Sequence, residues 1–236
     1  MTFQNKFSAT DPLYYKNHLL TETKEYNFLG TLINAKGQFK RSVEELSKKG
    51  MKVIFALRNR FSNFQSLPIS LSCKLFDTLI RPILLYNCEN WFMEINLPIV
   101  KSLERAVRNG NSCDILSLTD KSPYEKVHNK YCKTILGLKK TACNIAAKTE
   151  LGRLPLDYFI KTQIVLYFCR LNTENINPLL KEAYHINKTL HNDGVYSWYT
   201  STWKIFEECG LQTTDYENLN SPFCKIKSKI KKNFKK

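Results

Sequence analysis

Apolar residues recur at steps of three and four along most of the chain, the spacing that gathers them on one face of a helix. The first long stripe contains Gly50 and these apolar residues: Val43, Leu46, Ile54, Leu57, Phe61 and Phe64. This stripe predicts a helix from Ser42 to about Phe64. Ser42 and Glu45 have the spacing of a capping box, which marks a helix start.

A second apolar line runs from Leu71 to Ile83, after Leu67-Pro68 has broken the first helix. Ser70 is placed to cap this second helix. Pro82 falls inside the pattern, and proline lacks the N–H that a helix interior needs. We therefore expect the helix to be kinked or divided there, and we expect Trp91 to close the stretch in the core.

Helical patterns continue through the second half of the chain. They cover residues 99–109, 122–137, 141–150 and 155–171, a segment from Asn177-Pro178 onward, and a last segment from about Trp203 to Gly210. Ser122, Pro123 and Glu125 form a second capping box with proline at the first helical position. The segment 155–171 is strongly apolar, so we expect it to be central to this half.

The first forty residues differ from the rest. Residues 25–33 are rich in aromatic and β-branched side chains, and residues 35–37 supply a turn. This composition predicts a strand pair or a strand edge. Glycine and proline number only 8 each, which is few for the turns of an all-β protein. The predicted fold is mainly α, with a small N-terminal β-hairpin or strand edge followed by two helical regions.

The formal net charge of +15 favours a polyanionic partner, either nucleic acid or an acidic membrane surface. The candidate nucleic-acid-binding residues lie on the first predicted helix: Arg41, Lys48, Lys52, Arg58 and Arg60. The first three project opposite its apolar stripe, and the two later arginines flank it. An ordinary solvated helix would show the same division. The last twelve residues contain seven lysines and no acid, which fits a flexible arm, a nuclear-import patch or a solvated terminus.

The cysteine pattern indicates an intracellular protein, in the nucleus or the cytoplasm. The eight cysteines include no Cys-x-x-Cys pair, and the N-terminus has no apolar signal-peptide core. No run approaches the roughly 18 apolar residues of a membrane span. We therefore expect reduced thiols and no membrane partner.

No catalytic or cofactor motif is present. No two aspartates are adjacent, and there is no P-loop, Gly-x-Gly-x-x-Gly or His-Glu-x-x-His sequence. His128 and Cys132 lie four apart on one predicted helix, which could place two zinc ligands together. A core thiol beside a surface histidine is the favoured interpretation. We predict no catalytic residue, no metal and no cofactor.

Residues 26–33, residues 75–91, and residues 127–138 with 150–156 carry recognisable motifs. They resemble segments of the reverse transcriptases of LINE-type (non-LTR) retrotransposons. Residues 26–33 resemble the Tyr-x-Tyr-Leu-Gly segment that follows the palm. Residues 75–91 resemble the thumb segment that ends in Tyr-Gly-x-Glu-x-Trp, with Asn87 in place of the usual glycine. Residues 127–138 and 150–156 look like the region beyond the thumb. The match covers roughly residues 25–170.

This resemblance implies a palm-edge β segment over 1–40, a thumb-like helical domain over 41–110, a C-terminal helical region over 111–215 and a lysine-rich tail over 216–236. The family's aromatic-Ala-Asp-Asp motif would lie upstream of Met1, so the resemblance implies a truncated RNA-directed DNA polymerase with no activity from this chain alone. Its expected partner is RNA or an RNA–DNA duplex, bound without sequence specificity. A palm supplied by another chain and a helical protein-interaction module remain the alternatives.

Overall fold

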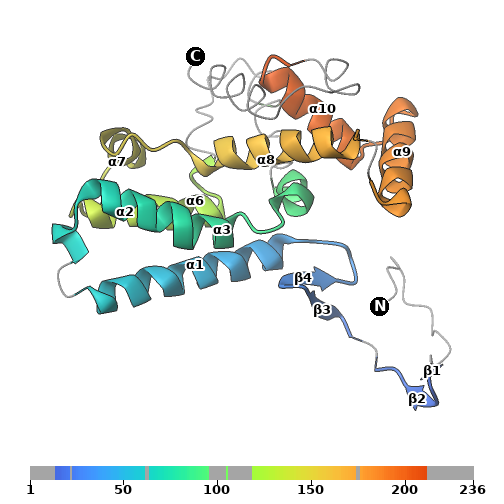
Figure 1. Ribbon diagram of the computed structural model, residues 1–236, viewed down its shortest axis with the longest axis horizontal. Coiled ribbons are helices and arrows are strands. Elements are labelled where there is room, and N and C mark those ends of the chain that lie inside the picture. Colours follow the sequence, from blue (N-terminus) through green and yellow to red (C-terminus); the bar gives the residue numbers. More distant parts are fainter. Residues whose placement is uncertain are drawn as a thin grey trace. The chain divides into compact units, whose positions relative to one another are not determined.

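The computed structural model describes residues 14–21, 23–61, 64–95, 105, 119–173 and 176–211. It is mainly helical with short N-terminal β-hairpins, as predicted (Figure 1). The predicted helix over 99–109, apart from residue 105, and the lysine-rich tail over 216–236 lie outside the described residues. The contacts divide the chain into two compact units, residues 1–87 with 94–147, and residues 88–93 with 148–236.

Two antiparallel hairpins begin the first unit. β1 (Tyr14–Tyr15) pairs with β2 (His18–Leu19), and β3 (Glu25–Phe28) pairs with β4 (Thr31–Asn34). The β1–β2 pair was not predicted, because its strands of two residues are too short to show an alternating pattern. Tyr26 and Phe28 remain more than half exposed on β3, at 56% and 54%.

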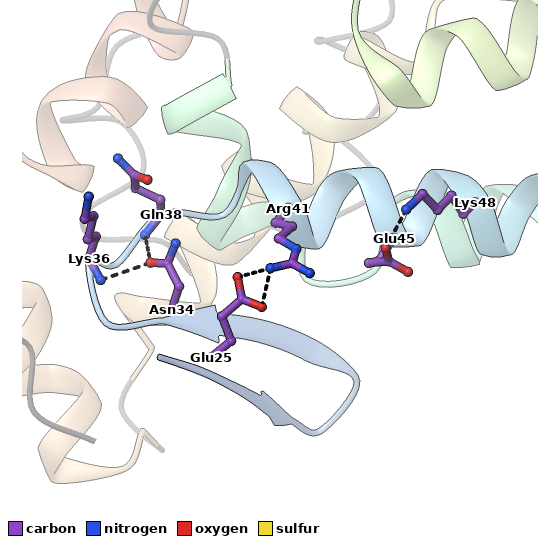
Figure 2. Close-up of polar contacts among 7 residues, drawn as sticks. All are labelled: Glu25, Asn34, Lys36, Gln38, Arg41, Glu45 and Lys48. Atoms are coloured by element: carbon purple, nitrogen blue, oxygen red, sulfur yellow. Dashed lines mark hydrogen bonds and ion pairs between the residues drawn. The ribbon is translucent and has the colours of Figure 1, made fainter. Parts of the chain in front are cut away.

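The turn of the β3–β4 hairpin differs in place from the predicted one. It lies at Leu29 and Gly30, which have φ values of 47° and 84°. The predicted turn over 35–37 instead connects β4 to the first helix. There the side chain of Asn34 accepts hydrogen bonds from the backbone N–H groups of Lys36 and Gln38, at 3.1 and 2.8 Å (Figure 2).

The first helix, α1 (Lys40–Arg60), does not begin with the predicted capping box. Its N-cap is Phe39, whose backbone N–H donates to Glu94 Oε2 at 2.6 Å. Ser42 lies inside the helix, where its Oγ accepts from the N–H of Leu32 at 3.3 Å. Glu94, distant in sequence, thus takes the role that the local pattern gave to Glu45, and Ser42 accepts from a strand instead of capping the helix. The helix also ends earlier than predicted, since Phe64 belongs to the 3₁₀ turn η1 (Phe64–Ser66).

Pro82 divides the next helix, as predicted. α2 (Ile69–Leu75) continues into the π-helical turn η2 (Phe76–Ile80) and then into α3 (Arg81–Leu84). A π turn widens the helix by one residue, which accommodates a proline that can neither donate nor fit the regular backbone. The predicted Ser70 cap is wrong, because the N-cap is Pro68 and no side chain bonds there.

α1 packs against α3 and against α6 (Pro123–Ile135) to form the core of the first unit (Figure 1). Gly50 permits this approach, because a Cβ at that position would lie 2.7 Å from Leu84 Cδ2 and 3.7 Å from Val127 Cγ1. Phe76 and Tyr131 fill the space beside them, with ring centroids 5.0 Å apart. The predicted apolar stripe is buried from Val43 through Leu46 and Gly50 to Ile54, whereas Leu57 and Phe61, nearer the end of the helix, are only half-buried.

α6 begins at the predicted residues, with half of the predicted capping box. Ser122 is its N-cap and accepts from the N–H of Glu125, and Pro123 stands at the first helical position. The Glu125 side chain does not complete a capping box. It lies 3.1 Å from His128 Nδ1, and both side chains are fully buried. The expectation that His128 lies at the surface is therefore wrong; its ring packs against Phe76 with centroids 4.8 Å apart.

The second unit is built around α8 (Leu156–Leu171), which confirms the central place predicted for that segment. Phe168 is fully buried and meets the rings of Phe206, Tyr184 and Tyr199 at centroid distances of 4.9, 5.9 and 5.9 Å. Two further described helices of the unit are α9 (Pro178–Asn192) and α10 (Trp198–Glu208). Trp91, on the helical residues 88–95, is fully buried as predicted. α7 (Asn144–Glu150) crosses the boundary between the units.

Candidate nucleic-acid interface

The five predicted binding residues all lie on α1, but they do not form one surface. Arg41 points toward the β3–β4 hairpin, where its Nη1 contacts both carboxylate oxygens of Glu25 at 2.5 and 2.6 Å (Figure 2). Lys48 is paired with Glu45 at 2.8 Å, one turn earlier on the same helix (Figure 2). The hydrogen bond from Lys48 lowers the pKa of the Glu45 carboxyl. Both cations are thus partly neutralised by neighbouring acids.

The other three predicted residues are exposed at the middle and the C-terminal end of α1. Lys52, Arg58 and Arg60 form no ion pair within the described part of the chain. An unpaired cation can contact a phosphate without first leaving a carboxylate. Arg58 differs from the other two because it lines a hollow.

This hollow, which we call the basic cleft, lies between the end of α1, α6 and the loop that leads to α7. Its volume is about 590 Å³. Its cationic lining is Arg58, Lys126, Lys130, Lys133 and Lys140. The remaining lining residues are Gln65, Asp120, Asn129, Thr134, Gly137, Leu138 and Asn144. Five cationic side chains therefore face one anionic side chain.

Asp120 is engaged by two side-chain amides. Asn129 Nδ2 donates to one carboxylate oxygen at 3.0 Å, and Asn144 Nδ2 donates to the other at 2.9 Å. These bonds hold the start of α7 against α6. With both oxygens already accepting hydrogen bonds, the carboxylate serves to shape the cleft.

The loop that closes the cleft is set by the end of α6. Gly137 has a φ of 65°, and the N–H of Leu138 donates to the carbonyl of Lys133 at 2.9 Å. This is the glycine-dependent helix ending that caps free carbonyl groups. Lys133 Nζ then donates to the carbonyl of Lys140 at 2.8 Å. The loop is thereby folded back so that Leu138 and Lys140 line the cleft.

An exposed aromatic ring stands beside the cleft on α1. Phe55 is 48% exposed, and the ammonium of Lys130 lies 5.0 Å from its ring centroid. Such a cation–π contact holds the long Lys130 side chain in one place. The cleft thus combines clustered positive charge with a nearby aromatic surface.

A second hollow near Arg41 has a different character. It measures about 270 Å³, and its charged lining is Glu25, Arg41, Glu45 and Lys49. The two acids offset the two bases. A polyanion gains little attraction from a surface of balanced charge, so this hollow is not part of the candidate interface.

The sequence analysis missed the four lysines of the basic cleft. Lys126, Lys130 and Lys133 follow one another at steps of four and three on α6, which places them on one helix face. This signal was present in the sequence, within a segment considered only for its apolar face. Lys140 lies in the loop after α6, and no local sequence pattern indicates that this loop brings it to the basic cleft.

The candidate zinc ligands of the sequence analysis do not form a metal site among the described residues. The described part of the chain contains no group of three or more His, Cys, Asp and Glu side chains that could hold a metal ion. His128 and Cys132 are both buried in the core of the first unit. No helix in the described ranges combines the length and the apolar character needed to span a membrane.

The sequence matches no protein-family model, and neither a curated protein nor a solved structure is detectably similar to it.

Proposed function

We propose that this chain is the thumb region and the following helical region of a LINE-type reverse transcriptase, and that it binds nucleic acid without sequence specificity. The observation that carries the binding activity is the basic cleft, in which five cationic side chains face a single carboxylate. Phosphate contacts by lysine and arginine supply most of the free energy of non-specific binding. The chain has no adjacent aspartates to hold catalytic metals, so we propose binding without polymerase activity.

Two segments on which the family resemblance rests meet in the first unit. Tyr86 and Asn87 belong to the thumb-like segment. They contact Leu29 and Thr31, which belong to the segment 26–33 that resembles Tyr-x-Tyr-Leu-Gly. Asn87 stands where the family has glycine, and its φ is 56°. Glycine adopts that conformation freely and asparagine tolerates it better than most residues. Asn87 therefore adopts a conformation that a glycine at this position would adopt freely.

Fluorescence anisotropy with labelled RNA–DNA duplexes tests the binding. We expect affinity to fall steeply between about 50 and 200 mM salt, because each phosphate contact releases counterions. Duplexes of unrelated sequence should bind alike, and magnesium should not permit primer extension. Affinity that does not change with salt would exclude phosphate contacts, and extension of a primer by the pure protein would overturn the proposed lack of polymerase activity.

An alternative function is protein–protein interaction, with or without a palm from another chain. One observation favours it: α9 exposes Leu179, Ile186 and Leu190, by 81%, 52% and 36%. Exposed apolar side chains gathered on one helix are typical of interaction surfaces. A chain that binds no nucleic acid at low salt but elutes with a partner protein would support this alternative.

A further inference from the structure

The basic cleft is too small for a double helix to enter. Its volume of about 590 Å³ falls in the range of about 300–1,000 Å³ that is usual for small-molecule sites. A duplex, whose major groove alone is about 12 Å wide, can only rest on the rim. One strand can place its phosphates inside.

Three of the lysines of the basic cleft lie in a row along α6. Lys126, Lys130 and Lys133 span two turns of α6 on one face, which is about 10 Å along the axis. Arg58 approaches from α1, and Lys140 approaches from the loop. The positive charge is therefore spread along a groove, which suits a chain of phosphates better than one isolated anion.

Phe55 adds a surface that only unpaired bases can use. Its ring is 48% exposed beside Lys130, whose ammonium lies 5.0 Å from the ring centroid. In a duplex the base faces are covered by their neighbours in the stack. In a single strand they are free, and stacking on an aromatic ring contributes about 1–3 kcal/mol per base.

We propose that the basic cleft binds single-stranded nucleic acid, with the phosphates on its cationic side chains and a base stacked on Phe55. This inference rests on the proposed function and narrows its ligand to an unpaired strand. The combination of a positive groove with an exposed aromatic ring is the general design of sequence-tolerant single-strand binding.

Anisotropy with a labelled single-stranded RNA and a blunt duplex of the same length tests the inference on the full chain. The cleft variant is K126E/K140E, and the matched control is K36E/K181E, which makes the same change of net charge at exposed lysines outside the cleft. We expect the single strand to bind at least about 10-fold more tightly than the duplex at low salt. The cleft variant should lose at least about 10-fold in single-strand affinity, and more than the control loses. Phe55→Ala should weaken single-strand binding by about 5-fold or more, and Phe55→Tyr should retain it.

A second measurement needs no variant. Lysine acetylation of the wild-type chain, followed by mass spectrometry, should show that the single strand protects Lys126, Lys130, Lys133 and Lys140 but not Lys36 or Lys181. Binding to neither ligand would overturn the proposed function itself. Equal or tighter duplex binding, equal losses in the cleft and control variants, or no protection of the cleft lysines would leave nucleic-acid binding in place and overturn the single-strand inference.

Discussion

The hydroxyl of Tyr86 donates a hydrogen bond of 2.6 Å to the carbonyl oxygen of Leu29, 57 residues earlier in the chain. The bond ties the segment that follows α3 to the tip of the β3–β4 hairpin. A Cβ on Gly30 would lie 3.5 Å from the same tyrosine ring, so the ring also lies close to the second residue of the turn. Tyr86 thus contacts both residues of the turn, Leu29 and Gly30, although it lies far from them in the sequence.

Leu29 is an unfavourable residue for this turn, and Leu29→Asn should stabilise the protein. Its φ of 47° is left-handed, which costs an ordinary residue about 1–2 kcal/mol. Asparagine before glycine is the preferred pair for such a two-residue hairpin turn. Leu29 is 75% exposed, so little burial is lost. We expect the free energy of unfolding, measured with urea, to rise by about 1 kcal/mol.

Leu179→Asn is the matched control for this prediction. Leu179 is 81% exposed and lies on α9 with ordinary helical backbone. The same chemical change there removes no backbone strain and should give no stabilisation. Equal effects of the two substitutions would show that backbone conformation is not the cause.

Asn87 should tolerate glycine better than alanine. Its φ is 56°, and its Nδ2 donates to Thr31 Oγ1 at 3.1 Å. Both substitutions lose this hydrogen bond. Only alanine is also destabilised by the left-handed backbone conformation, by about 1–2 kcal/mol. We expect Asn87→Ala to unfold at a lower urea concentration than Asn87→Gly. The reverse order would mean that the backbone relaxes out of the left-handed region.

Several helices and some of their boundaries could be predicted from the sequence, because their causes are local. Ser122 and Pro123 start α6, and Pro82 divides the helix that precedes it. Ser42 has the same kind of local pattern, yet it is not a cap. Its Oγ bonds to Leu32, and the N-cap N–H of Phe39 bonds to Glu94. A local pattern could not predict this start, because its partners are distant in sequence.

The candidate site could be predicted only in part, again because some of its contacts join residues that are distant in sequence. The polar face of α1 was predicted correctly, but the sequence did not indicate that Glu25 would pair with Arg41. Lys126, Lys130 and Lys133 could have been grouped from their helical spacing alone. Their meeting with Arg58 depends on the packing of α1 against α6, two helices that lie far apart in the sequence.

Gly50→Val should destabilise the first unit and also weaken nucleic-acid binding. A Cβ at Gly50 would lie 2.7 Å from Leu84 Cδ2, and Leu84 is fully buried. Overpacking of this kind costs about 1–3 kcal/mol, and a displacement of α1 away from α3 also moves Arg58, which α1 contributes to the basic cleft. Urea unfolding and anisotropy measure the two effects. Lys49→Val, at the exposed neighbouring position, should leave stability nearly unchanged; equal loss in both variants would contradict the packing argument.

Cys143 should be the most reactive of the six described cysteines. Its thiol is exposed, and hydrogen bonds from the backbone N–H groups of Ala146 and Ile145 lower its pKa. Burial raises the pKa of Cys169 and of Cys209 to about 11 and raises that of Cys88 as well. Since the thiolate is the reactive form, Cys143 should be alkylated first at neutral pH.

A short iodoacetamide pulse followed by peptide mapping measures this order. The rate at Cys143 should rise with pH to a plateau, and the midpoint of this rise should lie at a lower pH than for an unperturbed free thiol, because the pKa of Cys143 is lowered. Cys143 adjoins Asn144, which lines the basic cleft, so a single strand bound there should slow the reaction. Faster labelling of Cys169 or Cys209 at neutral pH would show that the start of α7 does not present its N–H groups to this thiol.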